Sequence, residues 1–167
     1  MSNISKQDES YIFLAQVEAE KSQCRTQHGA IAVCSGKIIG RGYNDYRNRT
    51  KTSDGHLEIG CTCHAEMNAI RDIFKTFNYH SSYNRDCRRI DKILSNTKLY
   101  VARVSGNTYK YCESTPCSDC LAVIKRLNIK RIIHTINDNV KIVNNIEQYN
   151  NNHKSSARRF LSRITKK

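Results

Sequence analysis

Two short segments of the chain, His64-Ala65-Glu66 and Pro116-Cys117-Ser118-Asp119-Cys120, concentrate side chains that can bind a metal ion. Imidazole nitrogen and thiolate sulfur are the ligands that Zn²⁺ prefers in proteins. A structural zinc site is closed by four protein ligands, whereas a catalytic site has three and leaves the fourth position to water. Because His64, Cys117 and Cys120 make three, the pattern predicts one catalytic zinc ion per chain.

Glu66 supplies the remaining reactive group, a carboxylate two residues after His64. Two residues correspond to about 200° of rotation on an ideal helix, so the carboxylate lies off the face that carries the imidazole. We therefore predict that Glu66 transfers protons between water and a substrate and does not bind the metal.

Each segment is expected to begin a helix. The apolar periodicity after His64, as far as Phe77, predicts one of them. Cys117 and Cys120 are three residues apart and would share one face of a helix that begins near Pro116, since proline is favoured in a first turn. The N–H groups and positive dipole end of a helix N-terminus stabilise thiolates. Both helices should therefore direct their ligands toward one point.

The rest of the chain alternates between helical and extended patterns, which predicts an α/β fold. Turns are expected at 24–29, at Ser35-Gly36 within a hairpin, and at 137–139 before an antiparallel last strand. We expect strands at 30–34, 37–42, 99–104, 131–136 and 140–143, and further helices at 8–22 and 155–165.

Length and composition predict one domain that spans residues 1–167. The sequence has no apolar run long enough for a membrane span and no apolar signal core near its start. We expect a soluble cytoplasmic protein that does not bind membranes, in the host cytoplasm if the chain is viral. Its eight cysteines should then be thiols or metal ligands rather than disulfides.

The chain is strongly basic, with 28 Lys and Arg against 15 acidic residues and a net charge of +13. Such a charge suits a polyanionic partner, although the abundance of Asn, Ile and Lys explains part of it by composition alone. Two basic segments stand out, an insertion at 78–96 with interleaved aromatic residues and the helix at 155–165. Either could bind nucleic acid, but the simpler interpretation is a solvated insertion and a helix packed on the sheet.

Five other cysteines and histidines could form a second, structural zinc site, namely Cys24, His28, His56, Cys61 and Cys63. Their spacing matches no compact zinc pattern, so we expect reduced thiols there. Cys34 lies in a predicted buried strand and is expected to be part of the core.

The two opening segments form the pattern H-x-E followed by P-C-x-x-C, which is a signature of zinc-dependent deaminases. Over residues 11–135 the chain resembles the cytidine and deoxycytidylate deaminase superfamily. The resemblance rests on the hairpin 30–42, Gly42-Tyr43-Asn44, the run 63–70 and Pro116-Cys117-Ser118-Asp119-Cys120. Gly42-Tyr43-Asn44 and the run 63–70 look most like the CMP/dCMP-type branch, since free-cytidine deaminases usually have Cys in place of His64.

The resemblance implies a three-layer α/β/α fold around a five-stranded mixed sheet, with zinc between the N-termini of the second and third helices. It implies that His64, Cys117 and Cys120 bind Zn²⁺ and that Glu66 shuttles protons. It further implies that Asn44 contacts the sugar of the substrate and that the backbone N–H of Ala65 faces a base carbonyl. A homo-oligomer, dimeric or larger, is also expected.

The activity expected from the resemblance is hydrolytic conversion of cytosine to uracil in a nucleotide or nucleoside such as dCMP or CMP. Asp45-Tyr46-Arg47 stands where deoxycytidylate deaminases commonly have Gly-x-Pro, and the last strand follows a tight turn as in the free-nucleoside branch. The substrate class therefore stays open. Alternatives are a deaminase of cytosine or adenine in single-stranded DNA or RNA, and a catalytically silent nucleic-acid-binding protein. The intact Glu66 argues against the silent protein.

Overall fold

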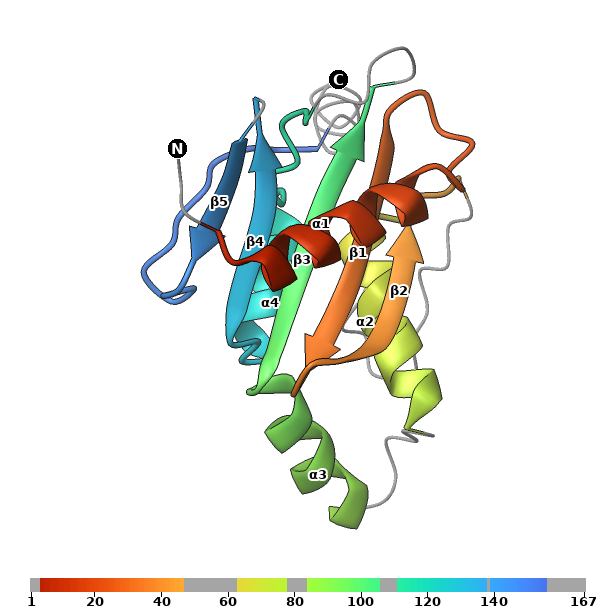
Figure 1. The fold of residues 1–167 in the computed structure, drawn as a ribbon. Helices are drawn as coiled ribbons and strands as arrows, with labels where there is room; N and C mark the ends of the chain where they lie inside the picture. The colour runs from red at the N-terminus through yellow and green to blue at the C-terminus, as the bar shows by residue number, and fades with distance from the viewer. Residues whose placement is uncertain (1–3, 47–62, 78–83, 106–110, 138, 156–167) are drawn as a thin grey trace, which may run out of the picture.

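Five strands form one mixed sheet in the order β2-β1-β3-β4-β5 (Figure 1). The computed structural model describes residues 4–46, 63–77, 84–105, 111–137 and 139–155. The strands are β1 (Gln27–Cys34), β2 (Lys37–Tyr43), β3 (Thr97–Val104), β4 (Arg131–Ile136) and β5 (Asn139–Val143). β1 runs antiparallel to both β2 and β3, β3 is parallel to β4, and β5 is antiparallel to β4.

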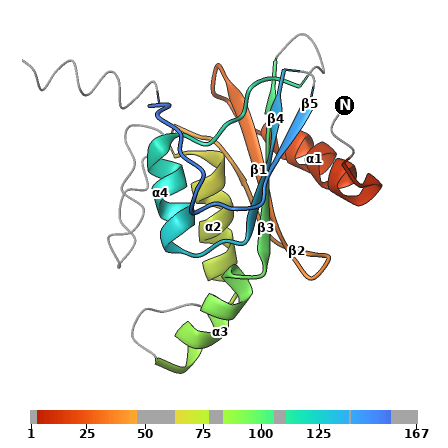
Figure 2. The same cartoon turned by 90° about the vertical axis from the view of Figure 1, so that its left-hand side faces the viewer.

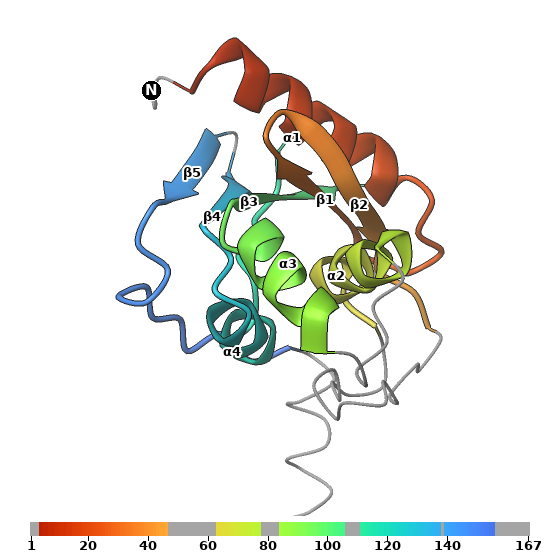
Figure 3. The same ribbon diagram turned by 90° about the horizontal axis from the view of Figure 1, so that it is seen from below.

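Helices cover both faces of this sheet. One face carries α1 (Lys6–Ala19), and the other carries α2 (Ala65–Thr76) and α4 (Ser118–Arg126) (Figures 1 and 2). The end-on view shows α3 (Asn84–Leu94) on the same side as α2 and α4 (Figure 3). The three-layer α/β/α architecture with a five-stranded mixed sheet is therefore confirmed. None of the described helices has the length and apolar character that a membrane span requires.

Alternation along the strands divides the core into two layers. Ile31 and Tyr100 point toward α1, whereas Ala30 and Leu99, their neighbours in sequence, point toward α2 and α4. Gly42 on β2 lies so close to α2 that a Cβ there would collide with the backbone of α2. The missing side chain thus sets how near the helix that follows His64 approaches the sheet.

The structure refines the interpretation of 78–96 as a solvated insertion: residues 78–83 lie outside the described residues, and the charged side chains described beyond them are exposed. Part of this segment is α3, whose Ile90 and Leu94 are buried in the core beneath it. These residues are four apart and form one stripe on the helix. Because many charged residues surround these two positions, the short apolar stripe could not be recognised from the sequence.

Several predicted boundaries also shift. The first helix covers Lys6–Ala19 rather than 8–22, and β1 already begins at Gln27, within the segment 24–29 that was expected to turn. Cys117 is the N-cap of α4, so Pro116 precedes the helix and is not in its first turn. Cys34 is half-buried rather than part of the core. The predicted helix at 155–165 lies, apart from its first residue, outside the described residues.

Candidate active site

The N-termini of α2 and α4 meet and bring three possible metal ligands together. His64, the N-cap of α2, has its Nδ1 3.1 Å from Cys120 Sγ and 3.4 Å from Cys117 Sγ. The ligand atoms of all three residues lie within 4.8 Å of one another. Within the described ranges, this is the group of His, Cys, Asp or Glu side chains that could hold a metal ion.

The donor set fits zinc in both chemistry and spacing. Bonds of about 2.0–2.3 Å in a tetrahedron place neighbouring ligand atoms roughly 3.5 Å apart, close to the separations from His64 to the two sulfurs. Two thiolates and one neutral imidazole also balance the charge of Zn²⁺. Three protein ligands leave a coordination position for a small molecule.

The two thiols differ in their readiness to ionise. The side-chain hydrogen bond with Cys120, together with that of His64, lowers the pKa of Cys117 to about 4 despite its burial. The same hydrogen bond, with Cys120 as donor, and complete burial raise the pKa of Cys120 well above its usual value. A metal ion that binds both sulfurs must therefore displace a proton from Cys120.

A cavity of about 160 Å³ opens beside this cluster. It is lined by Thr26, His28, Asn44, His64, Ala65, Glu66, Thr115, Cys117, His153 and Ser155. Five of the six site residues predicted from the sequence are therefore on its wall, while the sixth, Cys120, is fully buried beside them.

Glu66 presents a buried carboxylate to this cavity. Its side chain is only 6% exposed, and burial raises its pKa above the ordinary value, although the nearby positive charge of His64 opposes the shift. A carboxyl group with a raised pKa keeps its proton to a higher pH than an ordinary carboxyl group, which suits general acid–base catalysis.

Asn44, just after β2, is held by the main chain of the segment that leads into β1. Its Oδ1 accepts a hydrogen bond from His28 N, and its Nδ2 donates one to Thr26 O, both at 2.7 Å. A carboxamide has two N–H donors and two acceptor lone pairs. One donor and one acceptor thus keep the side chain in place, and the others can serve a ligand in the cavity.

Sequence reasoning missed Thr26, Thr115, His153 and Ser155, and named His28 only as part of a possible second zinc site. The position of Thr115 beside Pro116 was a usable signal. His153 and Ser155 gave none, because only folding brings the chain beyond β5 back to the cavity. Burial, with the positive charge of Arg103, lowers the pKa of His28 to about 4, so its imidazole is neutral at physiological pH.

The cysteines proposed for a second zinc site have other contacts. Cys63 Sγ lies 2.5 Å from an Arg71 guanidinium nitrogen and 3.1 Å from Asn68 Oδ1. Cys24 Sγ donates to the carbonyl of Asn44 at 3.6 Å. His56 and Cys61 lie outside the described residues. The described part of the chain therefore shows a single His and Cys cluster suited to a metal.

Comparison with known proteins identifies the family. The sequence model of the cytidine and deoxycytidylate deaminase zinc-binding region matches residues 5–136. The dCMP deaminase of the cyanophage S-TIM5 in apo form has a similar fold, with 23% identity, a TM-score of 0.50 and coverage of 78% of this chain and 84% of that chain. In its complex with dCMP and dUMP the identity is again 23% and the TM-score 0.50, over 79% and 83% of the two chains.

A cytidine deaminase from Burkholderia pseudomallei has a TM-score of 0.51 at 17% identity, and the match covers 84% of this chain and 93% of that chain. At such identities these structures show a shared fold only. No curated protein sequence matches this chain significantly. The family assignment therefore rests on the match over residues 5–136, by which the chain belongs to the cytidine and deoxycytidylate deaminase family.

Proposed function

We propose that the protein is a zinc-dependent hydrolase that converts cytosine to uracil in a nucleoside or nucleotide such as dCMP or CMP. The observation that carries this proposal is the buried carboxylate of Glu66 in the same cavity as His64 and Cys117. Membership of the deaminase family and the fold shared with a dCMP deaminase support it.

His64, Cys117 and Cys120 would hold the metal ion. When bound, Zn²⁺ acts as a Lewis acid that makes a water molecule a stronger acid and nucleophile. Cys117 and Glu66 line the same cavity. A water molecule in this cavity can therefore contact both the carboxylate of Glu66 and the base of a bound substrate.

Glu66 would move two protons in turn. It takes one from the attacking water and gives it to N3 of cytosine as oxygen bonds to C4. It then transfers the second proton of that water to the amino group, which leaves as ammonia. Water and cytosine thus yield uracil and ammonia, and the carboxylate is regenerated.

Asn44 and Ala65 would orient the substrate. The polar groups of Asn44 that are not bound to the main chain can hydrogen-bond a sugar hydroxyl. Ala65 is the first residue of α2, and the first N–H groups of a helix have no acceptor within it. The Ala65 N–H can therefore donate to the carbonyl oxygen of the base.

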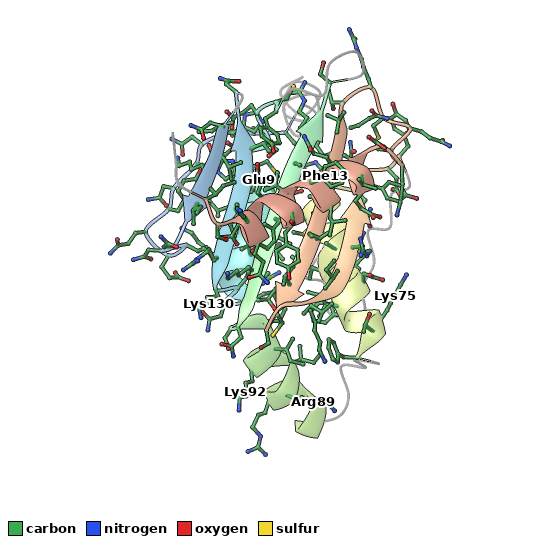
Figure 4. All side chains as sticks on the ribbon, viewed as in Figure 1. Glu9, Phe13, Lys75, Arg89, Lys92 and Lys130 are labelled. Carbon is green, nitrogen blue, oxygen red and sulfur yellow. The ribbon has the colours of Figure 1, made fainter. Side chains whose placement is uncertain are left out.

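The position of α3 favours a small substrate over a nucleic acid. The basic side chains of Arg89 and Lys92 project from this helix at the lower end of the view in Figure 4, and Lys75 in the last turn of α2 lies above them there. His64 caps the opposite end of α2, whose 12 residues span about 18 Å. The basic surface of α3 is therefore remote from the cavity and is not positioned to guide a strand into it.

The test is a product assay with purified, zinc-loaded protein. Cytidine, deoxycytidine, CMP, dCMP, cytosine, adenosine substrates and single-stranded DNA and RNA are each incubated, and products are separated by chromatography. We expect uracil products from one or more cytosine nucleosides or nucleotides, and none with Glu66→Gln at unchanged zinc content. Equal activity of Glu66→Gln, or wild-type turnover of the polymers alone, would contradict the proposal.

A further inference from the structure

The segment 151–155 contributes two residues to the cavity wall, although it lies beyond the region that matches the family. That region ends at residue 136, whereas His153 and Ser155 line the cavity beside Cys117. The family match therefore does not include this part of the wall.

Two hydrogen bonds fasten this segment beside Cys117, and a third lies within the segment. Ser118 N donates to the carbonyl of His153 at 2.8 Å, and Asn151 Nδ2 donates to the carbonyl of Pro116 at 2.8 Å. His153 N in turn donates to Asn151 Oδ1 at 2.9 Å. Because Pro116 and Ser118 flank Cys117, the backbone of His153 is fixed relative to the metal cluster.

His153 lies at the solvent side of the cavity. Its side chain is exposed, whereas Glu66 and Ala65 are buried at the inner side. The volume of about 160 Å³ is below the roughly 300–1,000 Å³ of typical small-molecule pockets. A base that reaches Glu66 would therefore fill the interior, and the sugar and its 5′ substituent would lie toward the rim.

Basic residues lie near His28 and His153 on the cavity wall. Arg103 on β3 is the partner of His28 in the β1–β3 register. The pKa of His28 is lowered mainly by burial, and the positive charges of Arg103 and His153 lower it further. Lys154 follows His153 and is also exposed. Carboxylates oppose this charge: Glu113 accepts a hydrogen bond from Thr115 Oγ1, Glu66 lies on the inner wall, and the charge of Asp119 acts on His64. The net charge of +13 on the whole chain adds a general attraction for anionic ligands.

We propose that His153 is a specificity-determining residue that binds the 5′-phosphate of a pyrimidine nucleoside monophosphate. An imidazole donates a hydrogen bond in either protonation state, and hydrogen bonds to an ionised phosphate are stronger than those to a neutral hydroxyl. The inference deepens the proposed function and rests on it for the placement of the base. A contact between His153 and the 5′-phosphate would make the nucleotide a better substrate than the free nucleoside.

The experiment compares ligands that differ only in the 5′-phosphate. Turnover is measured with dCMP and deoxycytidine, and binding with dUMP and deoxyuridine by calorimetry, in the zinc-loaded wild type and the variants His153→Ala, His153→Gln and Lys154→Ala. For His153→Ala we expect kcat/KM for dCMP to fall and Kd for dUMP to rise by about tenfold, the size of one hydrogen bond to a charged group. The two nucleosides should be unaffected.

The other variants separate a specific contact from general charge. His153→Gln keeps an N–H donor, so it should bind dUMP more tightly than His153→Ala does. Lys154→Ala removes a neighbouring exposed charge, and it should raise the Kd for dUMP less than His153→Ala does. Equal effects of His153→Ala on nucleotide and nucleoside, or equal effects of the two alanine variants, would overturn the inference. So would a wild type that binds dUMP no better than deoxyuridine. Binding of dUMP that depends on His153 without turnover of any substrate would instead overturn the proposed function and support the inference.

Discussion

His64 Nδ1 lies 3.1 Å from Cys120 Sγ, although 56 positions separate the two residues in the chain. The contact exists because α2 and α4 cover the same face of the sheet and present their N-termini at the same end of it. Each ligand is fixed by its place at a helix terminus, so the geometry of the cluster depends on how two helices pack and not on a local loop.

Removing a ligand should release the metal. For Cys117→Ser and His64→Ala we expect less zinc per chain than in the wild type, because two protein ligands hold the ion less tightly than three. Elemental analysis of the purified proteins measures this. Cys34→Ser is a matched control, since Cys34 is half-buried on a strand and should leave the zinc content at one ion per chain. Unchanged zinc in the Cys117 and His64 variants would contradict the assignment.

Glu66→Gln should separate catalysis from stability. Loss of the proton carrier should lower kcat by about 100- to 10,000-fold, while the zinc content stays the same.

Because burial raises the pKa of Glu66, its ionisation opposes folding once the pH exceeds the ordinary carboxyl range, and the wild type loses stability as the pH rises further.

Thermal melting of the metal-free proteins at several pH values tests this second part. The neutral amide of Glu66→Gln removes the cost of ionisation, so the variant should melt at a higher temperature than the wild type at neutral pH. The difference should shrink as the pH falls below the ordinary carboxyl range. A variant that melts lower than the wild type at neutral pH would show that Glu66 stabilises the fold as an anion.

The sequence was most informative where one physical pattern dominated a segment. The apolar run 30–34, the Ser35-Gly36 turn and the run 37–42 specified the β1–β2 hairpin closely. The pattern failed at α3, where two buried side chains stand among many charges, and local propensity cannot show which face a neighbouring layer will cover. His153 was equally inaccessible to such reasoning, because its role in the wall depends on a contact with Ser118 that only the tertiary fold creates.

A buried pair beneath α1 should make stability depend on pH. Tyr100 OH donates to Asp8 Oδ1 at 2.5 Å, and Lys98 Nζ lies 3.7 Å from the same oxygen. Burial alone would raise the pKa of Asp8, but the hydrogen bonds from Tyr100 and Ser5 and the charge of Lys98 outweigh it, and the net pKa is lowered. The stabilisation is therefore complete above the ordinary pKa of Asp and is lost as the pH falls through the lowered value.

Denaturant unfolding of Tyr100→Phe measures this contribution. At neutral pH we expect a loss of about 1.5–3 kcal/mol of unfolding free energy, as for a hydrogen bond to a charged group. The loss should diminish in acid, where Asp8 is protonated in both proteins. Tyr11→Phe serves as a control because Tyr11 OH donates to the exposed carbonyl of Gly36 instead. An equal loss at every pH would mean that Tyr100 acts through packing alone.

Gly42→Ala should disturb the metal cluster from a distance. A Cβ at this position would collide with the backbone of Ala65 and Ala69 in α2, so the helix must move away from the sheet and carry His64 with it. We expect a loss of about 1–3 kcal/mol of stability, as for overpacking of a core, together with weaker zinc binding in a competition assay with a chelator.

Gly36→Ala on the same hairpin is the control, because a Cβ there meets no atom within 4 Å and its cost arises only from the positive φ of 78°. Zinc affinity should be unchanged in Gly36→Ala, and an equal loss of affinity in both variants would show that reduced stability, rather than displacement of α2, weakens the site.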